Sequence, residues 1–261
     1  MYRNLKGKTV YITGASSGIG AACARVFAAA ECNVILTARR TNRIEALKTE
    51  LEQIHPKVRI HAVTLDVTTK EQVNQAVTNL PEDLQQVDVL INNAGVCSGD
   101  DLLVDISTVN IDTMIDTNIK GVVYMCQTFI PHMKRQAEGG MIINMSSIGA
   151  HQVAPRVSIY SATKHAIDAI TSTLRYELAD SHVRITAISP GYVDTEFSDA
   201  LFSGDQKKAD AFYRGIKQLQ AKDVAEVALF TASRPPHVEL ANIVVVAKGQ
   251  AHATYAHRHE E

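Results

Sequence analysis

The stretch TVYITGASSGIG, residues 9–20, decides the fold, because a short apolar run passes directly through a glycine-rich turn into an alanine-rich segment. The glycines of this turn are Gly14, Gly18 and Gly20. Glycine permits a tight turn and a close approach between the backbone and a bound group. A helix that begins here presents free N–H groups, which favour an anion such as phosphate. The turn therefore predicts a dinucleotide-binding site, although a plain strand-to-helix turn would use the same residues.

Six further apolar runs follow, and most are continuous rather than alternating, as expected for strands that are covered on both faces. With the first run, they span residues 9–13, 33–38, 58–65, 87–92, 140–145, 183–188 and 242–247. Between them, apolar residues recur at three- and four-residue intervals, which is typical of amphipathic helices. This alternation predicts an α/β fold with a Rossmann-type, doubly wound parallel sheet of about seven strands. No linker or repeat divides the chain, so we expect a single domain over residues 1–261.

Two arginines stand at the end of the second predicted strand. The segment LTARR places Arg39 and Arg40 about twenty residues beyond Gly20. In dinucleotide sites an acidic side chain near this position binds the adenosine ribose, whereas an arginine accommodates a 2′-phosphate. No carboxylate lies between residues 32 and 45, so the pair predicts NADP as the cofactor. Two solvated arginines at the start of a helix are the alternative.

Polar residues also follow the third and fourth predicted strands. Asp66 ends the third in TLDVT, and NNAG, residues 92–95, ends the fourth. Open α/β sheets bind ligands at the carboxyl ends of their strands. Asp66 could hold an adenine amino group or cap the following helix, and the two roles are compatible. Ser16 and Ser17 of the first turn could likewise donate to a ligand or cap a helix.

The composition narrows the classes of partner. The 261 residues are 46% hydrophobic and 21% charged, with a formal net charge of -2, which is typical of a soluble globular protein. A near-zero charge provides no electrostatic basis for nucleic-acid binding. No apolar run reaches the roughly 18 residues of a membrane span, and the N-terminus lacks the apolar region of a secretory signal. We therefore expect a cytoplasmic protein with a small-molecule substrate, and neither a nucleic-acid nor a membrane partner.

Cysteine and histidine spacing predicts no metal site. The four cysteines form no C-x-x-C pair and no metal-ligand pattern, so free thiols in a reducing compartment are expected. The polar segment 250–261 carries His252, His257 and His259. Their spacing matches no established ligand pattern, and we expect a solvated terminus.

Seven motifs, in a fixed order, resemble those of the short-chain dehydrogenase/reductase family. They are TGASSGIG, LDVT, NNAG, DTNIKG, NMSSIGA, YSATK and SPGYVDTEF. The resemblance covers nearly the whole chain and implies a nicotinamide cofactor across the carboxyl ends of the strands. It also implies that long helices near residues 111–135 and 158–179 pair between copies, as a homo-oligomer (a dimer or tetramer). Within the family, the chain is most similar to NADP-dependent dehydrogenases of 3-hydroxy acids, including serine and allo-threonine.

Tyr160 and Lys164 stand four residues apart in YSATK, so they share one face of a helix. The resemblance implies that Tyr160 is the general acid/base and that Lys164 also binds the nicotinamide ribose. A free phenol has a pKa of about 10. The neighbouring ammonium favours phenolate, so we expect it to lower the pKa of Tyr160.

Two more residues complete the set that the resemblance implies. Ser147, thirteen residues before Tyr160 in NMSS, would hydrogen-bond the reacting oxygen. Ser146 is the rival for this role, and the interval favours Ser147. Asn118 in DTNIKG would hold a water of a proton relay, or satisfy a kink in its helix.

The resemblance also implies the contacts of the cofactor. They are assigned to Gly14, Ser16, Ser17, Gly18, Ile19, Gly20, Arg39, Arg40, Asp66, Val67, Asn93, Ala94, Gly95, Tyr160, Lys164, Pro190, Gly191, Val193 and Thr195. The backbone of Val193 would meet the carboxamide, and Thr195 would lie near the phosphates.

Two segments, residues 148–159 and 196–219, should enclose the substrate. The second has Gly204 and Gly215 as possible hinges, and it interleaves charged residues with Phe197, Phe202, Phe212 and Tyr213. This pattern suggests a lid that is polar outside and apolar beneath. A surface helix pair with a structural aromatic contact is the alternative.

The resemblance makes hydride transfer between NADP and a small 3-hydroxy acid the leading function. The candidates for binding its carboxylate remain open: Arg156, Arg214, Lys217 and His151. The segment AGVCSGDD departs from the subgroup at Cys97 and Ser98, which keeps an oxidoreductase of apolar alcohols, ketones or aldehydes as the alternative. An NADP-binding regulator without turnover is a third hypothesis, and the intact catalytic set argues against it.

Overall fold

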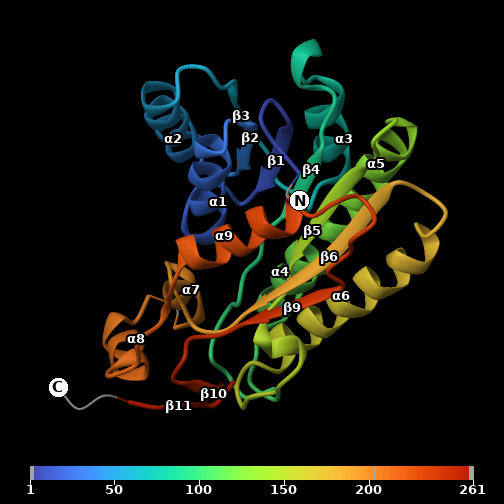
Figure 1. Cartoon of the computed structure of the whole chain (residues 1–261). Coiled ribbons are helices and arrows are strands. Elements are labelled where there is room, and N and C mark those ends of the chain that lie inside the picture. The colour runs from blue at the N-terminus through green and yellow to red at the C-terminus, as the bar shows by residue number, and fades with distance from the viewer. Residues whose placement is uncertain (1–2, 203, 259–261) are drawn as a thin grey trace.

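A computed structural model of the chain describes residues 3–202 and 204–258. Its centre is a seven-stranded parallel sheet in the order β3-β2-β1-β4-β5-β6-β9 (Figure 1). The strands are β1 Thr9–Thr13, β2 Asn33–Ala38, β3 Ile60–Thr64, β4 Val89–Asn92, β5 Gly140–Met145, β6 Val183–Pro190 and β9 Asn242–Val245. The predicted doubly wound sheet is confirmed. Its third, fourth and seventh strands are shorter than expected, because apolar residues continue into the adjoining turns.

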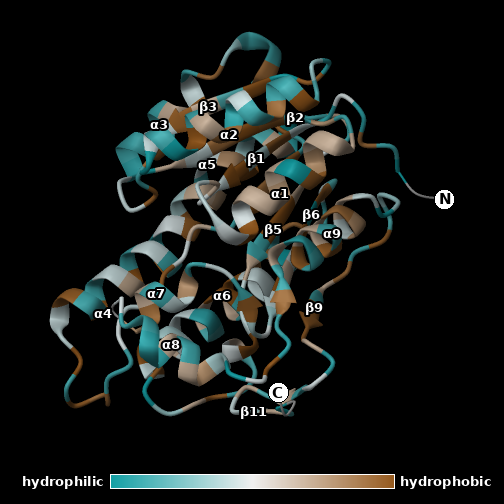
Figure 2. Cartoon of the chain, turned by 90° about the vertical axis from the view of Figure 1, so that its left-hand side faces the viewer, coloured by the Kyte–Doolittle hydropathy of each residue, from teal (hydrophilic) through white to brown (hydrophobic). Residues whose placement is uncertain are grey.

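Helices cover both faces of the sheet (Figures 1 and 2). The described α-helices are α1 Gly18–Ala29, α2 Thr41–Ile54, α3 Lys70–Thr78, α4 Thr108–Ile115, α5 Gly121–Arg135, α6 Ser158–Glu177, α7 Phe197–Leu201, α8 Gln206–Tyr213 and α9 Ala221–Ala232, of which α7 and α8 lie away from the sheet (Figure 1). Buried residues of α1, α2 and α9 form one apolar cluster with the sheet. Those of α3, α5 and α6 form a second cluster on the opposite face. The two clusters fix the sheet from both sides.

Strand β1 explains why the apolar runs are continuous. Val10 and Ile12 point into the cluster with α1 and α9, whereas Tyr11 points into the other. All three are fully buried. The Tyr11 ring packs edge-on against Phe129 of α5, with 4.9 Å between the ring centroids. Because successive side chains of a strand alternate between faces, a strand that is covered on both sides needs apolar residues at every position.

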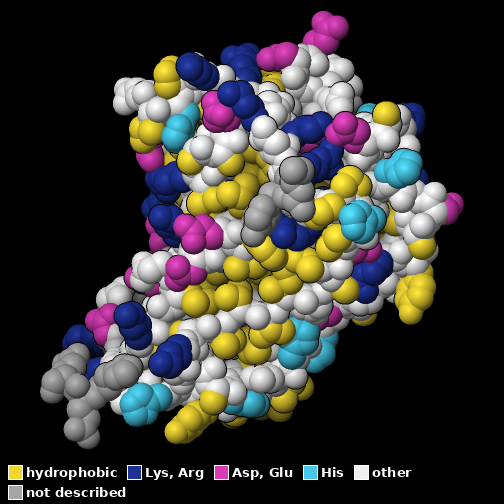
Figure 3. Space-filling model, viewed as in Figure 1, with side chains coloured by type: hydrophobic (Ala, Val, Ile, Leu, Met, Phe, Trp, Pro, Cys, Tyr) yellow, Lys and Arg dark blue, Asp and Glu magenta, His cyan; other side chains and the backbone are white. Residues whose placement is uncertain are grey.

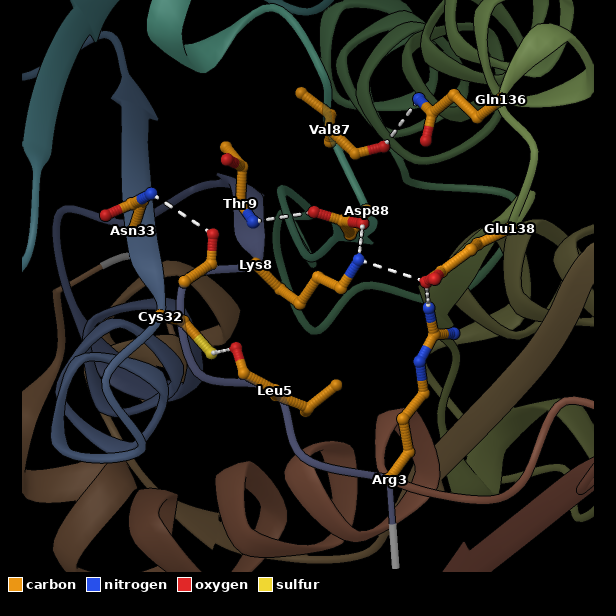
Figure 4. A network of polar contacts seen from close by, with 11 residues as sticks. Arg3, Leu5, Lys8, Thr9, Cys32, Asn33, Val87, Asp88, Gln136 and Glu138 are labelled. Carbon is orange, nitrogen blue, oxygen red and sulfur yellow. Dashed lines mark hydrogen bonds and ion pairs between the residues drawn. The ribbon is translucent and has the colours of Figure 1, made fainter.

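Charged contacts hold the amino ends of the strands (Figure 4). The Lys8 ammonium lies 3.1 Å from both Asp88 and Glu138, and Arg3 also pairs with Glu138. Asp88 in turn accepts a hydrogen bond of 2.9 Å from the backbone N–H of Thr9. These contacts join the start of β1 to the segments that lead into β4 and β5. They lie at the amino ends of the strands, opposite the site described below.

The strand order reverses between β1 and β4, and side chains tie these two carboxyl ends together. The Thr13 hydroxyl accepts hydrogen bonds from the backbone N–H groups of Asn93 and Ala94, at 2.9 and 3.0 Å. The Asn93 amide donates back to the carbonyl of Thr13 at 2.9 Å. Ligands of open α/β sheets bind at such a reversal point. The expected site therefore lies where the fold places an open crevice.

The C-terminal segment folds back onto the molecule. Strands β10 (Gln250–His252) and β11 (Tyr255–Ala256) pair as a hairpin. The Tyr192 hydroxyl donates to the carbonyl of Ala253 at 2.6 Å, and the N–H of Ala253 donates to Gln152 at 2.6 Å. The prediction of a merely solvated terminus is therefore wrong for residues 250–258, whose side chains are largely exposed but whose backbone is anchored.

Two short strands, β7 (Val193–Asp194) and β8 (Leu219–Gln220), pair beside the end of β6. They hold the ends of the segment that contains α7 and α8. Within residues 3–202 and 204–258, no cluster of three or more His, Cys, Asp or Glu side chains is placed to hold a metal ion. His259 of the predicted tail lies outside the described residues.

Charges of both signs intermingle on the face shown in Figure 3, and hydrophobic side chains gather over α9 and β9. Phe230 of α9 and Val244 of β9 are among the exposed hydrophobic residues. Among the described helices, none is both long and apolar enough to cross a membrane.

Candidate functional site

A groove of about 1100 Å³ runs over the carboxyl ends of the strands. This volume is slightly above the roughly 300–1,000 Å³ of small-molecule sites, so the groove has room for a dinucleotide beside a substrate. The predicted site residues that line it are Gly14, Ser16, Ser17, Gly18, Ile19, Arg39, Arg40, Asp66, Val67, Asn93, Ala94, Gly95, Ser147, Tyr160, Lys164, Pro190, Gly191, Val193 and Thr195. Gly20 and Asn118 do not line it, and each lies behind its wall.

The glycine turn forms a cradle that side chains would fill. Gly14 and Gly18 have φ angles of +66° and +52°, a backbone conformation that favours glycine. A Cβ atom at Gly18 would lie 3.2 Å from the Thr195 side chain, across the groove. At Gly20 a Cβ would collide with the carbonyl of Gly14, so this glycine allows α1 to pack under the turn. The cradle thus fits a pyrophosphate against the start of α1.

Arg40 lies directly over the glycine turn. Its guanidinium donates to the hydroxyls of Ser16 and Ser17, at 2.9 and 2.7 Å, and to the Glu196 carboxylate at 2.9 Å. Arg43 also donates to Glu196, at 2.6 Å. Neither Arg43 nor Glu196 was predicted from the sequence as a site residue. The LTARR stretch could have revealed Arg43, which follows one helical turn later, but no local signal identifies Glu196.

Arg39 lines the same groove, and no described residue pairs with its exposed side chain. At this end of the groove, Arg40 and Arg43 therefore pair with Glu196, whereas Arg39 pairs with no described residue. Arginine forks bind phosphate in two parallel hydrogen bonds. The adenosine end of the groove can accept a 2′-phosphate.

Asp66 does not cap α3, whose N-cap is Thr69, but it holds the turn that precedes this helix. One carboxylate oxygen accepts from the N–H and hydroxyl of Thr68, at 3.0 and 2.8 Å, in the turn before α3. The residue also lines the groove. Its hydrogen bonds to Thr68 fix the carboxylate at the groove wall, where it can accept from a ligand.

Tyr160 and Lys164 project from α6 into the middle of the groove. The buried Lys164 ammonium donates to the carbonyl of Met145 at 2.9 Å and lies 5.7 Å from the centre of the Tyr160 ring. Ser147 follows β5, and its Oγ accepts from the N–H of Gly149 at 3.0 Å. The Ser146 hydroxyl instead donates to Asp168 at 2.7 Å. Ser146 also lines the groove, but its hydroxyl is engaged by Asp168, which does not, so the arrangement favours Ser147.

The expected direction of the Tyr160 pKa is wrong for this structure. Burial raises the pKa of the phenol, and the Ser147 hydroxyl opposes this only in part. Burial also lowers the pKa of Lys164 to about 8, because desolvation disfavours its charged form. The Phe197 ring, 5.5 Å from that of Tyr160, contributes to this dry environment. Desolvation therefore has a larger effect on the pKa of Tyr160 than the Lys164 ammonium one helical turn away, and the phenol keeps its proton at neutral pH.

Asn118 lies in a π-helical turn, Asp116–Lys120, between α4 and α5. Its amide exchanges two hydrogen bonds with the backbone of Val96, each of 2.8 Å, and donates to the hydroxyl of Thr163 at 3.0 Å. π-helical turns are frequent at functional sites. Asn118 therefore fixes the loop after β4 against α6, one residue from Lys164.

Aromatic residues of the segment 196–219 cover the substrate end of the groove. A separate apolar cluster contains Cys97, Leu201, Phe202 and Ala209, with Val157, Tyr160, Phe197, Phe212 and Tyr213 packed against it. Gly204 and Gly215 both have positive φ angles, +82° and +71°. The underside of this segment is apolar, as the sequence suggested, and it packs directly on Tyr160.

The structure separates the four candidate cations for a substrate anion. Arg156 lines the groove, and its Nε lies 3.7 Å from Asp100. His151 does not line it and contacts Ser189 and Asp168. Arg214 and Lys217 are also absent from the lining. Arg258 of the C-terminal segment lines the groove and was missed by the sequence analysis, because the hairpin that places it is a tertiary feature.

The buried lysine predicts a pH dependence of stability. Its pKa is 10.5 when unperturbed and about 8 in the folded protein. Between these values the unfolded chain binds more protons, so the free energy of unfolding rises with pH across this window. Relative to Lys164→Met, we expect the wild-type protein to gain up to roughly 3 kcal/mol from pH 8 to pH 10.5.

Urea unfolding of both cofactor-free proteins at several pH values measures this gain. Lys57→Met, at an exposed position, is the control and should follow the wild type. Parallel curves for wild type and Lys164→Met would contradict the prediction.

Comparison with known proteins adds to this geometry. The model of the family described as short chain dehydrogenase matches residues 8–206. Sulfoacetaldehyde reductase 2 of Chromohalobacter salexigens is 38% identical over 95% of this chain and 97% of its own. The NADP-dependent 3-hydroxy acid dehydrogenase of Schizosaccharomyces pombe is 37% identical over 97% and 98%. The closed form of a serine dehydrogenase complexed with NADP+ superimposes with a TM-score of 0.89 at 32% identity, over 97% of this chain and 100% of that one.

Proposed function

We propose, on the premise that the chain belongs to the short chain dehydrogenase family, that it transfers a hydride between NADP and a small 3-hydroxy acid or its carbonyl counterpart. It is an oxidoreductase that acts on alcohol groups. When bound, the nicotinamide supplies or accepts the hydride. The glycine cradle would hold the pyrophosphate, and Arg39 and Arg40 would face the 2′-phosphate.

The side chains in the middle of the groove would carry the proton and the developing charge. Tyr160 would donate its phenol proton to the carbonyl oxygen in reduction, or take the proton of the alcohol in oxidation. Ser147 would donate a hydrogen bond to the same oxygen. Lys164 would hold the ribose and favour negative charge on Tyr160, and Asn118 would position the surrounding backbone. The Tyr160 phenol carries its proton at neutral pH, as a proton donor in the reductive direction requires.

The single observation that supports the proposal of an acidic substrate is the position of Arg156. It lines the groove in the loop that joins Ser147 to Tyr160, and its ion pair with Asp100 is long, with 3.7 Å between Nε and Oδ2. Its backbone has a φ of +70°, which is strained for a residue with a side chain. An anion within the groove could therefore take this guanidinium from Asp100.

The relatives support the same chemistry. In a 3-hydroxy acid and in sulfoacetaldehyde, the reacting carbon is separated from the carbon or sulfur of the anionic group by one intervening carbon. One cation at a fixed distance from Tyr160 would therefore serve either anion. The proposal for this chain is a small substrate with a carboxylate or a sulfonate at that spacing.

Arg156→Gln should raise KM for acidic substrates by about 10- to 150-fold, the range expected for losing a hydrogen bond to a charged group. The value of kcat should change less, because the anion is bound equally before and during the reaction. Steady-state kinetics with serine, allo-threonine, 3-hydroxypropionate and sulfoacetaldehyde, each with NADP(H) and NAD(H), measures both constants.

Arg258→Gln is the matched comparison. Arg258 also lines the groove but donates to the carbonyls of Phe212 and Arg214, so its loss should affect these substrates less. Methyl esters of the acids should react poorly with the wild-type protein, because they leave a pocket cation unpaired. Equal turnover of acids and esters would contradict the acidic substrate.

A second candidate function rests on the aromatic cluster. Phe197, Phe202, Phe212 and Tyr213 belong to the same apolar cluster as Tyr160, which would suit an apolar alcohol, ketone or aldehyde. In that case an aromatic ketone would outperform every acid in the same panel, and Arg156→Gln would leave its KM unchanged.

Two expectations of the sequence analysis remain proposals. A homo-oligomer would cover exposed apolar residues such as Phe230 and Val244. A cytoplasmic location would suit four cysteines that are all free. Turnover in the substrate panel would exclude the third hypothesis, a regulator without activity.

A further inference from the structure

Three consecutive residues contact three different parts of the groove. Thr195 faces the glycine turn, where a Cβ atom at Gly18 would lie 3.2 Å from it. Glu196 accepts from Arg40 and Arg43, at 2.9 and 2.6 Å. Phe197 packs on Tyr160, with 5.5 Å between the ring centroids. Each of these contacts is separated from the next by a single peptide unit.

Glu196 occupies the position of an anion between the arginines. The hydrogen bonds from Arg40 and Arg43 hold the pKa of its carboxyl group below its usual value, so it is ionised at neutral pH. Arg40 directs its Nε and Nη2 donors to Ser16 and Ser17. A phosphate that takes the Nη1 donors of Arg40 and Arg43 replaces the Glu196 carboxylate, which now accepts from both.

The ion pairs that Glu196 makes are easily replaced. The side chains of Glu196, Arg40 and Arg43 are 45%, 44% and 44% exposed. Ion pairs that are this exposed contribute little, because water and salt screen them. A phosphate offers more acceptor oxygens and more charge to the same arginine forks. NADH, which lacks the 2′-phosphate, brings no competing anion to this end of the groove.

We propose that Glu196 is an internal substitute for the 2′-phosphate of NADP(H). When NADP(H) binds, its 2′-phosphate displaces the Glu196 carboxylate from Arg40 and Arg43. This displacement releases residues 196–201 and separates Phe197 from Tyr160. The inference rests on the proposed use of NADP. Glu196 thereby opposes cofactor binding, and it links the adenosine end of the groove to the covering of Tyr160. The displaced carboxylate also leaves Arg43 free as a phosphate ligand beside Arg40.

Calorimetric titration with two fragments tests the proposal without turnover. Adenosine 2′,5′-bisphosphate and 5′-AMP differ only in the 2′-phosphate. Glu196→Gln should tighten the bisphosphate by about threefold to tenfold, the range for losing one or two competing exposed ion pairs, and should leave 5′-AMP unchanged. Asp199→Asn is the matched control: it removes a carboxylate from the adjoining α7 that contacts neither arginine, and it should keep the wild-type affinities.

Hydrogen exchange follows the release of the segment. In the wild-type protein, the bisphosphate should increase exchange in residues 197–201, and 5′-AMP should not. In Glu196→Gln, these residues should exchange faster before any ligand is added, and the bisphosphate should change them little.

The outcomes separate the two proposals. Equal bisphosphate affinity in wild type and Glu196→Gln, or the same tightening for both fragments, would overturn the role of Glu196 and leave the NADP site standing. Unchanged exchange in residues 197–201 on bisphosphate binding would overturn the release of Phe197. A wild-type protein that binds the two fragments equally, together with Arg40→Gln and Arg43→Gln variants that do the same, would overturn the NADP site and the role of Glu196 together.

Discussion

Tyr160→Phe should reduce kcat at least about a hundredfold, which corresponds to roughly 2.7 kcal/mol of barrier. The phenol is the proton donor that we assign to the carbonyl oxygen, and it stands beside Ser147 and Lys164 in the middle of the groove. Phenylalanine keeps the ring and its packing on Phe197, so only the hydroxyl is lost. Single-turnover reduction in the presence of saturating NADPH measures the chemical step directly.

The binding of NADPH separates a chemical loss from a structural one. Its affinity should stay within about threefold of the wild-type value, since Lys164 and the glycine turn are intact. Tyr213→Phe provides the control, because it removes a second phenol from the same aromatic cluster. Near-normal turnover in Tyr160→Phe would remove this residue from the acid/base role.

Gly20→Ala should lower the free energy of unfolding by at least about 2 kcal/mol, the cost of overpacking a site that cannot yield. A Cβ atom here would collide with the backbone carbonyl of Gly14 and lie 2.5 Å from the Asn93 amide nitrogen. That amide donates to the carbonyls of Thr13 and Gly14, which ties β1 to β4. The same change should weaken NADPH binding more than tenfold, because the glycine turn itself must shift.

Gly249→Ala is the matched control for this substitution. Its nearest neighbour would be the carbonyl of His257, at 3.5 Å, which is an ordinary contact distance. We expect it to alter stability by less than about 1 kcal/mol. Urea unfolding and calorimetric titration with NADPH measure both effects. Wild-type stability and affinity in Gly20→Ala would show that the turn can relax around a methyl group.

Much of the fold follows from short-range patterns in the sequence. The strands that begin at Thr9, Asn33 and Gly140 have the predicted bounds, because an apolar run covered on both faces is marked at every position. The spacing of Tyr160 and Lys164 predicts a shared helix face, and α6 presents both to the groove. The glycine turn is equally local, since its positive φ angles restrict residue type directly.

Boundaries and the C-terminal segment were less predictable. The strand expected over residues 58–65 begins only at Ile60, because the preceding residues form a turn in which Val58 donates to the carbonyl of His55. From their polar sequence, residues 250–258 were expected to form a solvated terminus. Their anchors, Gln152 and Tyr192, are provided by distant loops, so no local pattern could have indicated a hairpin at the groove.

The sequence by itself determined the order of the strands and helices of the main sheet and the position of the glycine turn, and it is the source of the residues proposed for the reacting centre. The tertiary structure alone decided how those residues are charged and what restrains them. Glu196 reaches Arg40 across 156 positions of the chain. Phe197 and the surrounding aromatic residues dry the environment of Tyr160, so that burial raises its pKa where the helical neighbour Lys164 predicted the opposite. Helical spacing depends on neighbours three and four residues away, whereas desolvation depends on every group that excludes water, and those groups come from the whole chain.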